Sequence, residues 1–298
     1  MTRVLFIGIG NMGWPMAARL LQAGHEVVVS DAVADRANDF ARQIGGEAAQ
    51  DLAAATASAD VIVTMLPTSH YVEQVLASLD GTLRKGQIVV DMTSGQPATT
   101  RRLAEALKPR GIALVDAPVS GGVSRAKTGE LAIMTGGDAQ ALDRVQPLLA
   151  AMGTTITRIG GVGAGQAMKA LNNLVSAGGF LIAVEALIIG QKFGLDPALM
   201  TDVLNASTGT NNSTQKKLKQ FVLSRSFDSG FGLDLMVKDL TIALDVGRDG
   251  AVPTPFAGLC REMWASAAAM LGKGEDHTAI AKLSEALSGE RLGNPGRP

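Results

Sequence analysis

The sequence predicts an α/β domain with a mainly parallel, doubly wound sheet, followed by an all-α domain built on one long helix. In the first half of the chain, short apolar runs alternate with helical stretches. A glycine-rich turn lies at residues 160–165, and beyond it helical patterns replace strand patterns. Regular alternation of strands and helices is typical of parallel sheets covered by helices.

The first half is expected to form a domain over residues 1–162. We expect strands at residues 4–7, 26–30, 61–65, 88–90, 112–115 and 131–134. Helices are expected between them, among others at 15–22, 69–79, 99–107 and 139–152. Pro15 suits a first helical turn, and Gly24 suits a helix end.

The second half is expected to form a helical domain over residues 163–288. The expected helices span residues 166–193, 197–205, 215–223, 235–246, 254–271 and 278–287. The first is long and apolar, but Gly178, Gly179 and Glu185 interrupt it, which favours a buried helix over a membrane span. The tail, residues 289–298, is rich in Gly, Pro and charge and is expected to be disordered.

Composition narrows the class of protein. The 298 residues are 46% hydrophobic and 18% charged, with a formal net charge of −1. Without a basic cluster, neither nucleic acid nor an anionic membrane is an expected partner. The apolar bias favours a homo-oligomer that buries surface between subunits. A single cysteine, Cys260, excludes an internal disulfide, and the chain enters a strand with no visible presequence, so we expect a cytoplasmic protein.

A glycine motif at the first strand predicts a dinucleotide site of the Rossmann type. The strand 4–7 leads into G-x-G-x-x-G, whose expected cofactor-binding residues are Gly8, Gly10, Asn11, Met12 and Gly13. The first glycine permits the tight turn, the second lets the backbone approach a pyrophosphate, and the third allows close helix–strand packing. The phosphates would lie at the positive end of the next helix.

The acidic residue after the second strand predicts the choice of cofactor. Asp31 follows Gly13 by 18 positions, where a carboxylate binds the adenosine ribose hydroxyls and repels a 2′-phosphate. We therefore expect NAD, with NADP less favoured. Two alternatives remain open: Asp31 caps the next helix, or Arg36 receives a phosphate. Two later strand ends should also face the cofactor, namely Leu66-Pro67 and Thr93-Ser94.

Two further patterns predict the reacting site. The run 116–122 ends in Ser120-Gly121-Gly122, and such a turn presents successive N–H groups that suit a carboxylate. The second pattern is G-x-x-G-x-G over residues 160–165, followed by Lys169 and Asn173. The last two lie one helical turn apart and so share a face. We expect the glycines to let the backbone approach a ligand.

Together these motifs resemble the β-hydroxyacid dehydrogenases, the family of 3-hydroxyisobutyrate dehydrogenase and tartronate semialdehyde reductase. The segments 64–69 and 230–240 also resemble this family, so the likeness covers nearly the whole chain. The resemblance implies that Lys169 is the catalytic acid/base, that Asn173 holds the substrate, and that Ser120, Gly121 and Gly122 bind its carboxylate. It places Phe231 and Lys238 near the cofactor, and it implies a homodimer or homotetramer.

The chemistry agrees with a lysine base. Oxidation of an alcohol by NAD needs a group that takes the hydroxyl proton while hydride leaves carbon. A free lysine, with a pKa of about 10.4, is a poor base at neutral pH. Burial and a nearby positive nicotinamide would lower the pKa of Lys169, which lies among apolar neighbours. The alternative is a solvated helix lysine.

Other features leave alternatives open. Residues 207–214 are short and polar, where 3-hydroxyisobutyrate dehydrogenases are expected to be longer and more aromatic; this favours a substrate with a hydroxyl or a second acid. Asn211 and Asn212 are equally well explained as turn residues. An imine reductase-like enzyme, which would generally lack Lys169, and a non-catalytic nucleotide-binding module are the competing functions. His25, His70 and His277 are expected in a turn, at a helix start and in a late loop, and this pattern suggests no relay. No acidic cluster suggests a metal site. The direction of the reaction is not fixed by the sequence.

Overall fold

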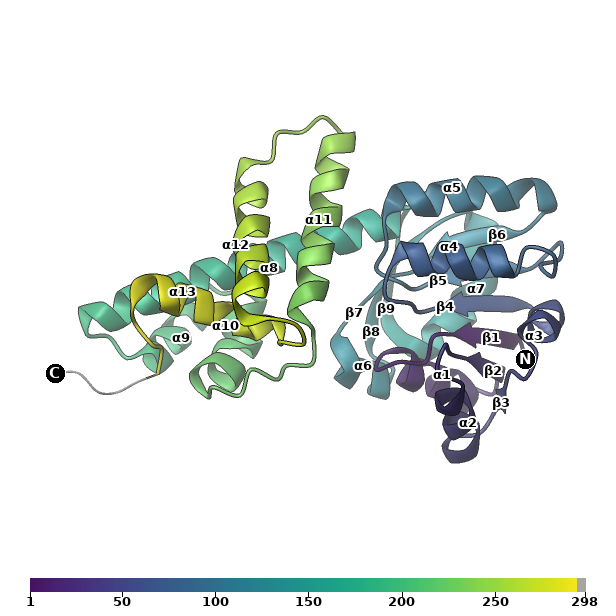
Figure 1. The fold of residues 1–298 in the computed structure, drawn as a ribbon, viewed down its shortest axis with the longest axis horizontal. Helices are drawn as coiled ribbons and strands as arrows, with labels where there is room; N and C mark the ends of the chain where they lie inside the picture. Colours follow the sequence, from purple (N-terminus) through teal and green to yellow (C-terminus); the bar gives the residue numbers. More distant parts are fainter. Residues whose placement is uncertain (294–298) are drawn as a thin grey trace. The chain divides into compact units, whose positions relative to one another are not determined.

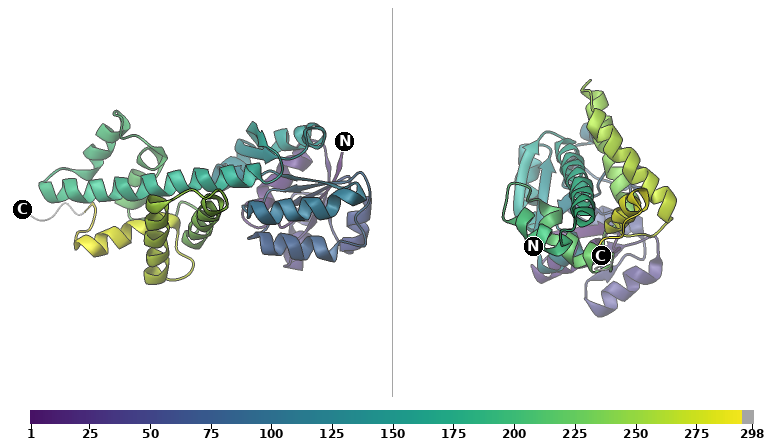
Figure 2. Two further views of the ribbon diagram at one scale, coloured as in Figure 1. Left: turned by 90° about the horizontal axis from the view of Figure 1, so that it is seen from above. Right: turned by 90° about the vertical axis from the view of Figure 1, so that its left-hand side faces the viewer.

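The computed structural model describes residues 1–293 in two compact units, Met1–Lys169 and a second that begins at Ala170. The boundary falls later than the expected 162/163. The reason is α8 (Ala164–Phe193), which starts in the first unit and continues into the second as one uninterrupted helix (Figure 2).

The first unit is built on a single sheet (Figure 1). Its strands are β1 (Arg3–Ile7), β2 (Glu26–Ser30), β3 (Glu47–Ala48), β4 (Val61–Thr64), β5 (Ile88–Asp91), β6 (Ala113–Asp116), β7 (Val119–Ser120), β8 (Leu131–Gly136) and β9 (Gly153–Gly160). Within residues 1–293 they run in the order β3-β2-β1-β4-β5-β6-β8-β7, with β9 beside β8. The pairs from β3 to β6 are parallel. This confirms the doubly wound sheet, whose strand order reverses between β1 and β4.

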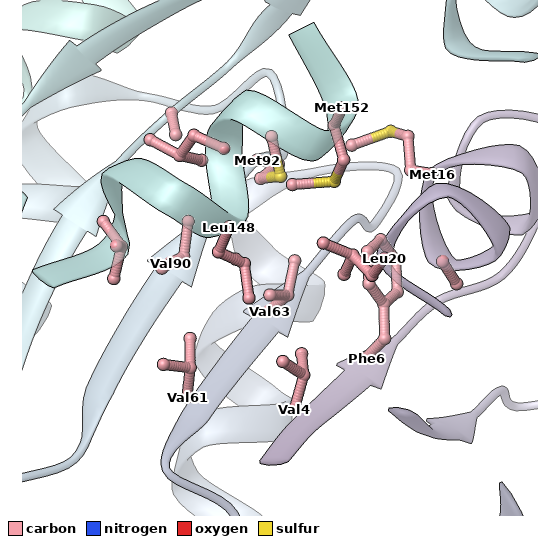
Figure 3. Close-up of a cluster of buried hydrophobic side chains, with 14 of the residues drawn as sticks. Val4, Phe6, Met16, Leu20, Val61, Val63, Val90, Met92, Leu148 and Met152 are labelled. Carbon is pink, nitrogen blue, oxygen red and sulfur yellow. The ribbon is translucent and has the colours of Figure 1, made fainter. Parts of the chain in front are cut away.

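Helices cover both faces of this sheet. They are α1 (Gly13–Gln22), α2 (Ala34–Gln43), α3 (Leu52–Ser58), α4 (Ser69–Ser78), α5 (Pro97–Leu107), α6 (Gly122–Thr128) and α7 (Ala139–Met152). Successive strand side chains point to opposite faces, so Val4 and Phe6 join a core with α1 and α7, which Figure 3 shows. Leu5 and Ile7 join a second core with α3, α4 and α5. Burial on both faces explains the continuous apolar runs of these strands.

The sequence did not predict β3, β7 or β9. The first two have only two residues each. Strand β9 pairs in parallel with β8, but most of its side chains are exposed and polar, so it lacks the apolar pattern of a buried strand. The other expected strands agree with the structure to within one or two residues.

The second unit is helical, as predicted. Its helices are α8, α9 (Pro197–Asn205), α10 (Asn212–Lys216), α11 (Leu233–Asp249), α12 (Pro255–Leu271) and α13 (Ala281–Ser288), with a π-helical turn at Leu218–Leu223 and a 3₁₀ turn at His277–Ile280. Its core centres on Phe180 of α8 and Trp264 of α12. Among its described residues, strand-like pairing is limited to one bridge between Gly232 and Asp276.

The expected disordered tail is wrong for its first five residues. Leu292 is buried, and its N–H donates to Glu285 Oε1 over 2.9 Å. Gln191 Nε2 of α8 donates to Arg291 O over 2.9 Å, and Gln191 Oε1 accepts from Gly293 N–H. One buried leucine, together with hydrogen bonds to Glu285 and to the distant Gln191, therefore holds this segment in place despite its composition. The remainder of the expected tail, 294–298, lies outside the described residues.

Helix α8 is long and apolar enough to cross a membrane by length and composition. More than half of its most apolar window is buried inside the protein, however. The core helix of a soluble protein passes the same test, so this property is weak support for a membrane span.

Candidate active site

The three glycines in the turn between β1 and α1 have different surroundings and therefore different roles. Gly8 has φ +94°, and a Cβ there would lie 2.4 Å from Met65 O. At Gly13 a Cβ would lie 2.0 Å from Gly8 O. A Cβ at Gly10 would meet no atom within 4 Å, so this glycine faces open space. Gly8 and Gly13 therefore serve the folding of the turn, whereas Gly10 leaves the backbone accessible to a ligand, as dinucleotide binding requires.

The rest of this turn also fits a dinucleotide. Asn11 is exposed and Met12 is half-buried against the core. Met12, the N-cap residue of this ten-residue helix, makes no side-chain capping hydrogen bond, so the positive N-terminal end of α1 can bind a phosphate. The residues present thus fit the expected cofactor.

Asp31 is tied to the glycine turn. Its Oδ2 accepts the Ile9 N–H over 3.0 Å, and its Oδ1 accepts the Val33 N–H over 2.9 Å. Arg36 Nη1 also lies 2.9 Å from Oδ1. The carboxylate is therefore fixed at the end of β2, beside the turn, which is where a ribose would be bound. The bond to Ile9 was not foreseen.

The later strand ends meet at the same edge of the sheet. Leu66 N–H donates to Thr93 Oγ1 over 3.0 Å, which ties the end of β4 to the end of β5. Leu66 also lies against Gly8, because a Cβ on that glycine would be 2.8 Å from its Cδ2. Pro67 is exposed and Ser94 is half-buried. The four parallel strands β1, β2, β4 and β5 thus bring these predicted cofactor residues to one edge.

The Ser-Gly-Gly turn follows β7. Ser120 ends the strand, Gly121 has φ +135°, and Gly122 has φ +68°. Consecutive positive φ values are accessible to glycine but strained for other residues. The stem of Arg125 lies against Gly121, where a Cβ would be 2.7 Å from its Cδ. This backbone suits the expected nest of N–H groups.

Two of the glycines before Lys169 pack against other parts of the first unit. A Cβ at Gly165 would lie 2.3 Å from Met134 O, and one at Gly163 would lie 3.1 Å from Pro97 O. The protein's own chain occupies the space at both positions. At these two positions close packing within the protein itself requires glycine, and the expectation that the backbone approaches a ligand there stays a prediction. They allow the start of α8 to pack closely against β8 and α5 within the first unit.

Lys169 and Asn173 lie one turn apart on α8, as predicted. Asn173 Nδ2 donates to Asp239 Oδ2 on α11 over 2.6 Å. Lys238 Nζ lies 3.2 Å from Asp239 Oδ1, and the Asp239 residue is only 2% exposed. Asp239 therefore orients the amide of Asn173. The sequence analysis placed Asp239 only within the segment 230–240 and gave it no role, although its position next to the predicted site residue Lys238 is a signal in the sequence.

Phe231 is held by the segment before α13. Its N–H donates to Asp276 Oδ2 over 3.2 Å, and its carbonyl accepts the His277 N–H over 2.8 Å. His277 is buried beside Trp264, with Lys217 Nζ 2.8 Å from its Nε2. Expected in a loop, His277 instead belongs to a 3₁₀ turn that positions Phe231.

The shifted pKa values of His277 and Asp276 agree with a structural role for these two residues. Burial is the main cause that lowers the pKa of His277 below its usual 6.5. Burial acts to raise the pKa of Asp276, but hydrogen bonds from His277 and Thr278 outweigh it and hold this pKa far below its usual range. Ser229 and Asp276 both lie at Nδ1 of His277. In a nucleophilic triad the serine and the acid contact different nitrogens of the histidine ring, so these three residues do not form one.

Asn211 is a helix cap. Its Oδ1 accepts from Ser213 N–H and Thr214 N–H, while its own N–H donates to Thr214 Oγ1. Its Nδ2 donates to Gly179 O over 3.2 Å. Of the two explanations left open for Asn211, the structure supports the turn residue, because the side chain serves the start of α10.

A dinucleotide-type sheet joined through a lysine-bearing helix to a helical unit defines a two-domain nicotinamide-dependent dehydrogenase. Residues 3–161 match the family described as the NAD binding domain of 6-phosphogluconate dehydrogenase. Residues 163–284 match the NAD-binding domain of NADP-dependent 3-hydroxyisobutyrate dehydrogenase.

Individual proteins agree with these families. The chain is 37% identical to a 3-hydroxyisobutyrate dehydrogenase of Pseudomonas aeruginosa, covering 95% of this chain and 98% of the relative. It is 36% identical to 2-(hydroxymethyl)glutarate dehydrogenase of Eubacterium barkeri, covering 96% of each. The structure of Mycobacterium tuberculosis 3-hydroxyisobutyrate dehydrogenase with L-serine matches with a TM-score of 0.87 and 32% identity, over 95% of this chain and 98% of that one. The chain belongs to the β-hydroxyacid dehydrogenase family.

An imine reductase from a Pseudomonas species is more distant. It is 20% identical, with a TM-score of 0.61, and covers 95% of this chain and 99% of its own. At this level of identity the likeness concerns the fold alone.

Proposed function

We propose that this protein is an NAD-dependent dehydrogenase that interconverts a small 3-hydroxy acid and its semialdehyde. The observation that carries the proposal is the arrangement on α8, where Lys169 is followed one turn later by Asn173, whose amide Asp239 holds in place. Relatives that cover nearly the whole chain are named for acids of this kind.

The residues divide the reaction between them. The nicotinamide, when bound, takes up or releases the hydride. In the oxidative direction Lys169 accepts the hydroxyl proton as the carbon–hydrogen bond breaks, and in the reverse direction it returns that proton. Asn173 donates to the reacting oxygen, while Ser120 and the N–H groups of Gly121 and Gly122 bind the carboxylate. With the carboxylate held there, the reacting carbon would lie at a fixed distance from Lys169 and from the cofactor site.

NAD is the proposed cofactor because Asp31 is fixed at the end of β2 with both oxygens engaged. A carboxylate there accepts from ribose hydroxyls and repels a 2′-phosphate. Arg36 is paired with this carboxylate, which favours its holding Asp31 over receiving a phosphate. The match to a family described as NADP-dependent makes this choice worth testing directly.

Replacing Asp31 with Ala together with Ala32→Arg should move the cofactor preference toward NADP. Removal of the like charge and addition of a cation should lower the ratio of kcat/KM for NAD over NADP by about tenfold or more. The ratio isolates selectivity from the general weakening caused by loss of the bond to Ile9. Asp35→Asn is the matched control, because Asp35 is an exposed acid at the start of α2. An unchanged ratio in the double variant would show that Asp31 is not the selector.

The substrate class is tested with a panel of short acids. Reduced-cofactor absorbance is followed with NAD and NADP against serine, glycerate, 3-hydroxypropionate, 3-hydroxyisobutyrate and threonate. Turnover of one acid supports the proposal, and preference for an acid with a polar side group supports the expectation drawn from residues 207–214. Turnover of a cyclic imine alone would support the imine reductase alternative, and binding of NAD without turnover of any compound would support a binding module.

We propose that the protein forms a homodimer or homotetramer through the second unit. On α8, Val175, Ile182 and Ile189 recur every seven residues and so lie on one face. All three are exposed, Val175 to 77%, and Phe193 at the end of the same helix is 84% exposed. Apolar stripes of this kind mark contacts between subunits more often than free surface. The near-zero net charge and the lack of a basic cluster in the sequence favour a second copy of the chain as the partner over nucleic acid or a membrane. The cytoplasm stays the expected compartment.

Light scattering after size exclusion should therefore give a mass above that of one chain at micromolar concentration. The variant Ile182→Glu with Ile189→Glu should dissociate the oligomer, because it places two charges within the stripe. Val252→Glu, at an exposed apolar position in the loop before α12, is the control and should not dissociate it. A monomeric wild-type protein at micromolar concentration would refute the proposal.

A further inference from the structure

The helix that carries Lys169 lacks a capping side chain of its own. Its first residue is Ala164, preceded by Gly163 with φ +89°. The first N–H groups of a helix have no acceptor within the helix, and a Ser, Thr, Asp or Asn just before it usually supplies one. Glycine has no side chain, so the acceptor must come from another element.

Asp116, at the end of β6, supplies that acceptor. Its Oδ1 accepts the Gly163 N–H over 2.7 Å, and its Oδ2 accepts the Gln166 N–H over 2.8 Å. The carboxylate is fully buried (0% exposed) and makes no ion pair with residues 1–293. The N–H groups and the positive end of α8 offset part of the cost of burying its charge.

Glycines shape the space around this carboxylate. A Cβ at Gly136 would lie 2.7 Å from Asp116 Oδ1, and one at Gly165 would lie 2.8 Å from Oδ2. Either contact would force the carboxylate or the backbone to move. The site is thus built for a carboxylate in this one position.

Gln166 continues the connection to the cofactor edge. Its Nε2 donates to Thr93 O over 2.7 Å, and its Oε1 accepts the Gly95 N–H over 2.8 Å. These two bonds bracket Ser94, the residue expected to face the cofactor. The same amide also lies 3.4 Å from Asp91 Oδ2. One glutamine therefore fixes the start of α8 to the turn after β5.

We propose that Asp116 and Gln166 are positioning residues. They hold Lys169 at a fixed place relative to the turn after β5, which is expected to face the nicotinamide cofactor. The inference rests on the proposed function. Lys169 follows Gln166 by three residues, or about 4.5 Å along the helix axis. Proton and hydride transfer depend on distances set by different elements, and a displacement of about 1 Å is enough to slow such a step about a hundredfold. A helix start fixed at two points supplies that accuracy.

The chain offers a matched control for Gln166. Gln87, at the opposite end of β5, is also 1% exposed. Its Nε2 donates to Thr56 O and Ala59 O, and its Oε1 accepts the Arg84 N–H. Gln166→Leu and Gln87→Leu thus remove the same kind of buried, bridging amide, one at the cofactor edge and one away from it.

Steady-state kinetics with the accepted acid test the proposal. Gln166→Leu and Asp116→Asn should each lower kcat about 10- to 100-fold, with a smaller change in KM. The deuterium isotope effect on kcat, from an acid labelled at the reacting carbon, should rise because hydride transfer becomes more rate-limiting. Gln87→Leu should lower Tm without changing kcat or the isotope effect. If all three variants lose Tm alike and keep the wild-type kcat, the positioning role is overturned.

A second readout does not depend on turnover. Reductive methylation, followed by mass spectrometry, gives the reaction rate of each lysine, and Lys85, Lys108 and Lys127 serve as internal references. The rate at Lys169 should change at least about threefold in Asp116→Asn and Gln166→Leu but not in Gln87→Leu, because the reactivity of a lysine depends on its surroundings. Unchanged labelling of Lys169 overturns the inference. A wild-type protein that is inactive on every acid contradicts the proposed function alone.

Discussion

Lys169→Ala should lower kcat by about 10²- to 10⁴-fold, the range that general acid/base catalysis contributes. This corresponds to about 3–5 kcal/mol of transition-state stabilisation. Without the amine, water must accept the hydroxyl proton while hydride leaves carbon. The proposed carboxylate site at Ser120–Gly122 and the glycine turn at Gly8–Gly13 do not include Lys169, so substrate and cofactor should still bind.

The measurement is kcat and KM at saturating cofactor, together with cofactor affinity. Trp14 is the second residue of α1, beside the glycine turn, and its fluorescence provides a binding signal in the variant. Lys169→Arg is the control for charge, because a guanidinium keeps the positive charge but does not release its proton near neutral pH. It should be nearly as inactive as the alanine variant. Full activity of Lys169→Ala would assign the base to another residue and return the imine reductase alternative to consideration.

The features that the sequence predicted best are those that depend on local pattern. The G-x-G-x-x-G turn, the acid at the end of β2 and the lysine and asparagine one turn apart all follow from spacing within one strand–helix unit. Strand β9 was not predicted because its side chains are mostly exposed. Its pairing with β8 depends on backbone hydrogen bonds, which do not require a particular side-chain pattern.

The features that were missed depend on contacts between distant segments. Asp239 lies 66 positions from the asparagine it orients, and Asp116 lies 47 positions from the glycine it caps. His277 reads as a loop residue but is buried against Trp264 and Phe180. The close packing at Gly163 and Gly165 was not predicted, because a glycine that approaches its own chain has the same sequence signature as one that approaches a ligand. Such assignments require coordinates.

Asp116 should also make the stability of the protein fall as pH rises between about 4 and 6. Burial raises the pKa of its carboxyl from 3.8 to about 6, and nearby Asp91 adds to this, against the opposing effect of the hydrogen bonds from Gly163 and Gln166. The folded state therefore holds a proton on Asp116 at pH values where the unfolded chain has lost it. The corresponding stability is fully present below pH 3.8 and is lost as pH rises through about 6. A shift of this size corresponds to about 3 kcal/mol.

Urea unfolding of the wild type and Asp116→Asn across pH 4 to 7 measures this contribution. The free energy of unfolding of the wild type minus that of the variant should fall by up to about 3 kcal/mol over this range, because only the wild type has a carboxyl to titrate there. Taking the difference cancels the titration of groups common to both proteins. Asp138→Asn is the control, since Asp138 caps α7 from an exposed position, and its difference should not decrease in this way. A difference for Asp116→Asn that rises with pH would mean that the N–H groups at the start of α8 stabilise the carboxylate by more than burial destabilises it.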